Sequence, residues 1–136
     1  MKTISQYVKD KNITLTIVED NGLQPGDSKE WPGEWYDYKV RIDYDGRSLT
    51  EGYRMGSALT DKPSAGMVLG TLVADARLYA ANQDNMDAYS GEIGEDDPDE
   101  ARKAYNRDRA CYQRLAAWLP GGEDELNDLM FNYDDN

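Results

Sequence analysis

Acidic side chains dominate two segments of the sequence, and their density is the clearest hint of chemistry. Residues 84–100 contain eight acids and no lysine or arginine, and residues 123–136 contain six acids, again without a base. The acids of the first segment are Asp84, Asp87, Glu92, Glu95, Asp96, Asp97, Asp99 and Glu100. Those of the second segment are Glu123, Asp124, Glu125, Asp128, Asp134 and Asp135.

Metal binding and carboxylate catalysis are two interpretations of these acids. An EF-hand loop that began at Asp84 would put Glu95 at position 12, but Met86, Ala88 and Tyr89 would fall where ligands and a glycine are needed. Nothing singles out two carboxylates about 5–10 Å apart across a sugar cleft, as glycoside hydrolysis requires. We therefore expect no metal, no cofactor and no catalytic residue. A small carboxylate-metal hydrolase stays open as a second alternative.

Composition excludes several further classes of enzyme. The chain has 136 residues, 27 acids, 15 bases, a formal net charge of −12, no histidine and one cysteine. Without histidine it has no His-based triad and no imidazole metal ligand. The single Cys111 excludes an intramolecular disulfide and a cysteine zinc site, and we expect it to be an inert core thiol. The charge also argues against direct binding to DNA or RNA phosphates, which calls for clustered lysine and arginine.

Imitation of nucleic acid is the third interpretation of the acids. B-DNA presents one charge per about 1.7 Å of its axis, and eight acids in seventeen residues are dense enough to occupy a basic groove. Residues 1–83 carry a net charge of −2 and residues 84–136 carry −10, so the acidity is concentrated. Acid runs are more often solvated loops or helix caps that maintain solubility, and this stays the first explanation of these acids. The sequence favours a binding module over an enzyme.

Aromatic and basic residues are the other candidates for binding. Trp31, Trp35 and Tyr36 flank Pro32-Gly33, and Trp and Tyr are typical anchors of interfaces. The alternative is that Trp35 and Tyr36 lie on opposite faces of a sheet and that one of them packs inward. The basic residues of the long C-terminal helix are expected to pair with acids of the same chain rather than to bind phosphate: Arg102, Lys103, Arg107, Arg109 and Arg114.

The sequence pattern around these residues predicts an α+β fold with a three-stranded antiparallel sheet. A short helix from Thr3 or Ser5 to about Lys11 is expected to precede strands at 13–17, 36–44 and 47–55, because apolar residues alternate there. Asp45-Gly46 matches a type I′ hairpin turn between the last two strands. A loop with turn signals at Asn21-Gly22, Pro25-Gly26 and Pro32-Gly33 is expected before the second strand.

The sequence predicts that the second half of the chain, residues 60–131, is helical. A helix over about 64–81 would be capped by Ser64 or Asp61, and another over 98–119 would be capped by Asp97 with Glu100 completing a capping box. A short helix is expected at about 124–131, and the stretch 79–97 is expected to form the most acidic loop. The sequence predicts one domain: a helix and sheet in 1–57, a helical half in 60–131 that covers one face of the sheet, and a frayed tail in 132–136.

The N-terminus has no apolar segment typical of a signal peptide, and the most apolar stretch, residues 66–76, is too short to span a bilayer. We therefore expect a cytoplasmic protein without membrane contact.

Four stretches resemble a group of small, mostly uncharacterised proteins encoded by bacteriophages and prophages: ISQYVKDKNITL, DYDGRSLTEGYRMGSA, KPSAGMVLGTLVADA and ARKAYNRDRACYQRLAAWL. Residues 79–97 and 121–136 resemble the group least. The resemblance implies a bacterial cytoplasm during infection and, by analogy with other small acidic proteins of mobile elements, inhibition of host defence of the anti-CRISPR or anti-restriction kind.

Together these observations predict a phage-encoded, non-enzymatic inhibitor of a host defence system that targets nucleic acid. Its partner would be a host protein or ribonucleoprotein complex with a basic nucleic-acid-binding groove, and the acids of both segments would enter that groove. An adaptor or regulatory protein that binds a host protein through an aromatic surface is the alternative.

Overall fold

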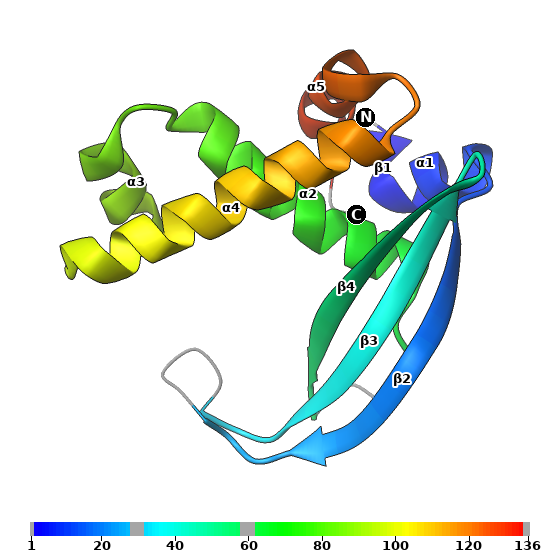
Figure 1. The fold of residues 1–136 in the computed structure, drawn as a ribbon, viewed down its shortest axis with the longest axis horizontal. Helices are drawn as coiled ribbons and strands as arrows, with labels where there is room; N and C mark the ends of the chain where they lie inside the picture. Colours follow the sequence, from blue (N-terminus) through cyan, green and yellow to red (C-terminus); the bar gives the residue numbers. More distant parts are fainter. Residues whose placement is uncertain (1, 28–31, 58–61, 135–136) are drawn as a thin grey trace.

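A computed structural model of the chain describes residues 2–27, 32–57 and 62–134. It has an α+β fold, as predicted, in which a three-stranded antiparallel sheet has the order β2-β3-β4 (Figure 1). The first half contains β1 (Lys2–Thr3), α1 (Ile4–Asp10), β2 (Thr14–Gln24), β3 (Trp35–Tyr44) and β4 (Arg47–Gly56). The second half contains α2 (Ala65–Ala81), α3 (Met86–Ile93), α4 (Pro98–Trp118), α5 (Gly122–Asn132) and β5 (Tyr133–Asp134).

The core lies between one face of the sheet and the helices. Tyr38, Val40 and Ile42 alternate along β3 and are buried on this face, as the strand period requires. They join one apolar cluster with residues of α2 and α4, including Leu69 and Leu115, neither of which has any exposed surface. Figure 1 shows the helices gathered on one side of the sheet, with the far ends of the strands extending beyond them.

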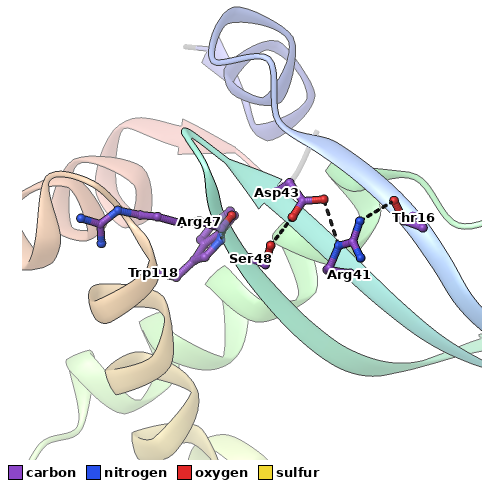
Figure 2. A network of polar contacts seen from close by, with 6 residues as sticks. All are labelled: Thr16, Arg41, Asp43, Arg47, Ser48 and Trp118. Atoms are coloured by element: carbon purple, nitrogen blue, oxygen red, sulfur yellow. Dashed lines mark hydrogen bonds and ion pairs between the residues drawn. The ribbon is translucent and has the colours of Figure 1, made fainter.

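The β3–β4 hairpin turns at Asp45-Gly46, where φ is 52° and 76°. Two successive positive values are what a type I′ turn needs, so the predicted turn is confirmed. The hairpin is joined to the end of α4, because the Trp118 indole donates to the Arg47 carbonyl at 3.2 Å and Arg47 donates to the Ala117 carbonyl at 3.1 Å. Figure 2 shows Trp118 beside Arg47 at this junction.

Polar contacts cross the opposite, outer face of the sheet. The Asp43 carboxylate accepts hydrogen bonds from the Ser48 hydroxyl and from Arg41 Nε, the latter at 3.1 Å. Arg41 also donates to the Thr16 hydroxyl at 3.5 Å, so the chain of contacts joins all three strands (Figure 2). The bond from Ser48 also affects the charge of Asp43: it holds the pKa of the Asp43 carboxyl below its ordinary value, against the effect of burial and with help from Arg41.

The turn yields a test with a matched control. Gly46→Ala is expected to lower the free energy of unfolding by about 1–2 kcal/mol, because an L residue is strained at the positive φ of this position. Gly52→Ala, in the middle of β4, has equally open space for a Cβ but no positive φ, so its effect should stay within about 0.5 kcal/mol. Urea denaturation measures both variants, and equal losses would contradict the turn assignment.

β2 runs farther than predicted. The expected strand ended at Ile17, but β2 continues through Asn21-Gly22 to Gln24. The register with β3 shifts between Ile17 and Glu19 and again between Asp20 and Gly22, where φ of Gly22 is 75°. These irregularities let the strand absorb a sequence that is typical of a turn and still pair with β3.

The C-terminal end also differs from the prediction of a frayed tail. Tyr133 and Asp134 form β5, which pairs in parallel with Lys2 and Thr3 of β1. Arg77 of α2 donates to the carbonyls of Met130 at 2.8 Å and Tyr133 at 3.3 Å. Residues 135 and 136 lie outside the described residues.

Two of the predicted helix caps are confirmed. Thr3 caps α1 and forms a complete capping box with Gln6. Ser64 caps α2 by accepting a hydrogen bond from the Met67 amide; the other candidate, Asp61, lies outside the described residues.

Candidate functional site

Residues 86–93 form a helix, α3, rather than the predicted acidic loop. The Asn85 side chain caps its first turn by accepting from the Ala88 amide at 3.2 Å. Gly94 ends it in a left-handed conformation with φ of 70°. Asn before a helix and Gly after it are ordinary boundary signals, so the sequence did contain the information. The density of acids between those signals led to the wrong prediction.

A group of tyrosines fixes α3 against α4. The Tyr89 side chain is fully buried, its ring centroid lies 5.3 Å from that of Tyr105, and its hydroxyl donates to the Ala104 carbonyl at 3.3 Å. Tyr105 also packs edge-on against Tyr79 of α2 and accepts from the Asp84 amide at 3.3 Å. The acids of α3 are therefore carried by an anchored helix rather than by a free loop.

The start of α4 is capped in a way that differs in part from the prediction. Asp97 is the N-cap and accepts from the Asp99 amide at 2.9 Å, as expected of this position. Glu100 does not complete a capping box with it, because Glu100 pairs with Lys103 at 3.3 Å. The Asp97 amide donates instead to the Glu95 carboxylate at 3.3 Å.

We call the eight carboxylates of residues 84–100 the acidic surface. All of them are exposed except Glu95, which is half-buried. Several border an open cleft of about 1070 Å³ between the end of α3 and the first half of α4. The cleft is not purely acidic, since Lys103 and Arg107 of α4 also line it.

Part of the basic face of α4 is neutralised within the chain, as predicted. Besides Lys103, Arg107 pairs with Asp108 at 3.4 Å and Arg114 pairs with Glu51 of β4 at 2.8 Å. The contact with Arg114 also explains why an acid stands on the inner face of β4. Arg102 and Arg109 form no ion pair within the described ranges.

The acids of α5 do not join the acidic surface. α4 has 21 residues and is therefore about 30 Å long, and α3 and α5 lie at its opposite ends (Figure 1). Glu123, Asp124 and Asp128 are exposed at the α5 end. The two predicted groups of partner-binding acids are thus separate patches.

Glu125 faces the protein interior rather than a partner. Its carboxylate accepts hydrogen bonds from the hydroxyls of Tyr7 and Tyr44, the latter at 2.7 Å, and from the Gly121 amide at 2.8 Å. Burial opposes ionisation of Glu125, but these three bonds outweigh it and hold its pKa below the ordinary value. Burial and the bond to Glu125 raise the pKa of Tyr7. The prediction that Glu125 binds a partner is corrected: it joins α5 to α1 and β3.

The predicted aromatic anchors are not gathered on the surface. Trp35 is only 6% exposed. The Arg54 guanidinium carbon lies 4.0 Å from the centroid of its ring, and its indole N–H donates to the Pro25 carbonyl at 3.0 Å. Tyr36 lies on the inner face of the sheet, packed against the core and half-buried. The two residues therefore straddle the sheet, as the alternative expected. Trp31 lies outside the described residues.

The sequence patterns did not single out Asp108. Its side chain is 1% exposed and interrupts the apolar stripe of α4, where its spacing from Ala101, Tyr105 and Cys111 places it on the buried face. That spacing was visible in the sequence. Cys111 itself donates to the Leu72 carbonyl at 3.3 Å, and burial raises the pKa of its thiol to about 12, so the predicted inert core thiol is confirmed.

Within residues 2–27, 32–57 and 62–134, no three acidic or cysteine side chains are grouped closely enough to hold a metal ion. The helices of those same ranges lack the length and apolar character that a membrane crossing requires. No family model, curated protein or solved structure matches this chain. Any functional conclusion therefore rests on the residues and their geometry.

Proposed function

We propose that this chain is a phage-encoded, non-catalytic inhibitor that acts in the bacterial cytoplasm. It occupies the basic nucleic-acid-binding groove of a host defence complex of the CRISPR or restriction class. The observation that carries the proposal is the acidic surface, which extends from just before α3 to the first turn of α4 and in which every carboxylate except that of Glu95 is exposed. Such a density of negative charge is comparable to that of a nucleic-acid backbone.

The anchoring of α3 supports this function physically. Neighbouring carboxylates repel each other, and in a free loop they would spread apart and would have to be reordered on binding. Tyr89 and Tyr105 fix α3 and so hold its two acids, Asp87 and Glu92, in place beforehand, which reduces the entropy cost of association. Asp87, Glu92 and Asp96 form no ion pair with any described residue, so their charge is free to attract a basic partner and to accelerate the encounter.

The covered ring of Trp35 weakens the alternative of an aromatic adaptor surface. Tyr36 is the one predicted aromatic anchor in the described ranges that keeps part of its side chain exposed, and it points toward the core.

The proposal is tested by inhibition of DNA cleavage by a panel of purified restriction endonucleases and CRISPR effector complexes. The protein is added before the DNA substrate. For an enzyme of the panel that is inhibited, the triple variant Asp87→Asn, Glu92→Gln, Asp96→Asn is expected to require at least about tenfold more protein for the same inhibition, because each lost charge pair at an interface costs on the order of 1 kcal/mol.

The matched control neutralises three exposed acids of α5: Glu123→Gln, Asp124→Asn and Asp128→Asn. This variant has the same net charge as the first but an intact acidic surface, so it should inhibit like the wild type. Equal weakening by the two variants would show that only net charge matters. Inhibition of no enzyme in the panel would count against the proposed function itself.

A further inference from the structure

The sheet has two edges, and they differ in regularity. β2 forms one edge and is interrupted by two register shifts. β4 forms the other edge and pairs with β3 without a shift from Trp35↔Gly56 to Tyr44↔Arg47. Because bulges are a common means of preventing an edge from pairing with another strand, β2 is protected and β4 is not.

The backbone groups on the free side of β4 can be identified from the turn. In a two-residue hairpin the residues flanking the turn, Tyr44 and Arg47, exchange hydrogen bonds, and the bonded pairs then alternate. The amides and carbonyls of Ser48, Thr50, Gly52 and Arg54 therefore point away from β3. No backbone hydrogen bond in the described part of the chain takes up these groups.

A groove adjoins this edge on the helix side of the sheet. It has a volume of about 370 Å³ and lies between Tyr53 of β4 and one face of α2. That face is built mainly from small residues: Gly66, Met67, Gly70, Thr71, Ala74 and Asp75. A strand added to β4 would lie about 4.8 Å beyond it, and every second side chain would point the same way as Tyr53. The one beside Tyr53 would enter this groove.

The charge of the edge differs from that of the rest of the chain. The exposed residues of β4 are Arg47, Ser48, Thr50, Gly52 and Arg54, with no acid among them. Arg54 pairs with Asp27 at 3.7 Å, so Arg47 is the cation of this edge that has no acidic partner in the described part of the chain. Glu51 faces the helices and is paired with Arg114. A second copy of this chain is a poor occupant, because two molecules that each carry a charge of −12 repel each other.

We propose that β4 and α2 form a docking site for an extended segment of a partner protein. The segment adds to β4 as a fourth strand, places an apolar side chain in the groove beside Tyr53, and carries an acidic residue at the end opposite Arg47. This is the strand-addition mode of peptide recognition, in which the backbone supplies affinity and the groove supplies specificity. The site is separate from the acidic surface and does not depend on its function.

The test titrates the ¹⁵N-labelled protein with a nine-residue peptide of alternating Val and Thr that has Asp at both ends. Binding should shift the amides of β4 and α2 and give cross-strand nuclear Overhauser effects between the peptide and Thr50 or Gly52. The same peptide with Lys at both ends should bind this site several-fold more weakly and shift amides of α3 and the start of α4 instead.

Thr50→Pro removes an outward amide without breaking the β3–β4 ladder, since proline is tolerated at such edge positions. It should weaken peptide binding at least about tenfold, whereas Thr50→Val, which keeps the amide, should bind like the wild type. If Thr50→Pro proves unfolded by circular dichroism, Ala74→Leu serves in its place, because it fills the groove and leaves the edge amides intact.

Three results would overturn the proposal. The first is the absence of shifts in β4 at millimolar peptide. The second is unchanged binding by Thr50→Pro or Ala74→Leu. The third is a set of β4 shifts that depends on protein concentration without peptide, which would assign the edge to a second copy of the chain.

Discussion

Replacing Glu125 by alanine is expected to lower the free energy of unfolding by about 2–4 kcal/mol. The carboxylate accepts hydrogen bonds from Tyr7, Tyr44 and the Gly121 amide, and Tyr7 is only 2% exposed. Removal of the carboxylate leaves the buried Tyr7 hydroxyl without its acceptor. Each hydrogen bond to a charged group contributes about 1.5–3 kcal/mol, and the contribution is smaller here because solvent reaches half-buried Glu125. Urea denaturation at pH 7 measures the loss.

Asp124 is the control for this effect, since it precedes Glu125 in the same helix but is exposed. Asp124→Ala should change the free energy of unfolding by no more than about 0.5 kcal/mol. A similar loss in both variants would mean that acids at the start of α5 act through the helix dipole and not through the two tyrosines.

The same cluster predicts a pH dependence. The folded-state pKa of Glu125 is lowered below its ordinary value of 4.5, so its contribution to stability is fully present above that value. The contribution is lost as the pH falls through the lower, folded-state pKa. The difference in unfolding free energy between the wild type and Glu125→Gln should therefore shrink as the pH falls below about 4.5. A difference that stays constant over that range would contradict this role of the carboxylate.

Tyr89→Ala is expected to release α3 from α4 with little effect on the sheet. Truncation of a fully buried aromatic side chain costs about 3–5 kcal/mol, and Tyr89 is the one residue of α3 that is buried. Since each 1.4 kcal/mol is a factor of ten, hydrogen exchange of the α3 amides should accelerate by about 100-fold or more. Exchange in β3 should remain close to that of the wild type.

Tyr89→Phe separates the ring from the hydroxyl in this experiment. It keeps the packing against Tyr105 and loses the bond to the Ala104 carbonyl, so α3 should stay attached at a cost of about 1 kcal/mol. Parallel acceleration in α3 and β3 after Tyr89→Ala would show that α3 unfolds only with the whole domain. The anchoring of the acidic surface would then need another explanation.

The parts of the fold that the sequence predicted well are those fixed by local pattern. Alternation along β3 and β4, and a turn whose two residues both adopt positive φ, determined the hairpin without knowledge of any partner. Likewise, Asp97 followed by Pro98 marked the start of α4 within a stripe of apolar spacing.

The parts that were missed depend on contacts distant in the sequence. The continuation of β2 through Gly22 needs pairing with Asp37 of β3, and the burial of Trp35 needs Pro25 and Arg54. The inward orientation of Glu125 depends on tyrosines more than 80 residues away. In each case a residue was assigned to a loop or to the surface because its partner was not adjacent in the chain.

Imitation of nucleic acid is tested by displacement of fluorescent DNA from an inhibited effector, followed by anisotropy at several salt concentrations. The protein should compete with DNA, and the inhibition constant should rise with salt because the contact is between charges. Neutralising Asp87, Glu92 and Asp96 should raise the constant at least about tenfold and flatten its salt dependence, while the three changes in α5 leave both unaltered. Inhibition that leaves DNA bound, or that responds equally to the two triple variants, would contradict the acidic surface as an imitation of nucleic acid.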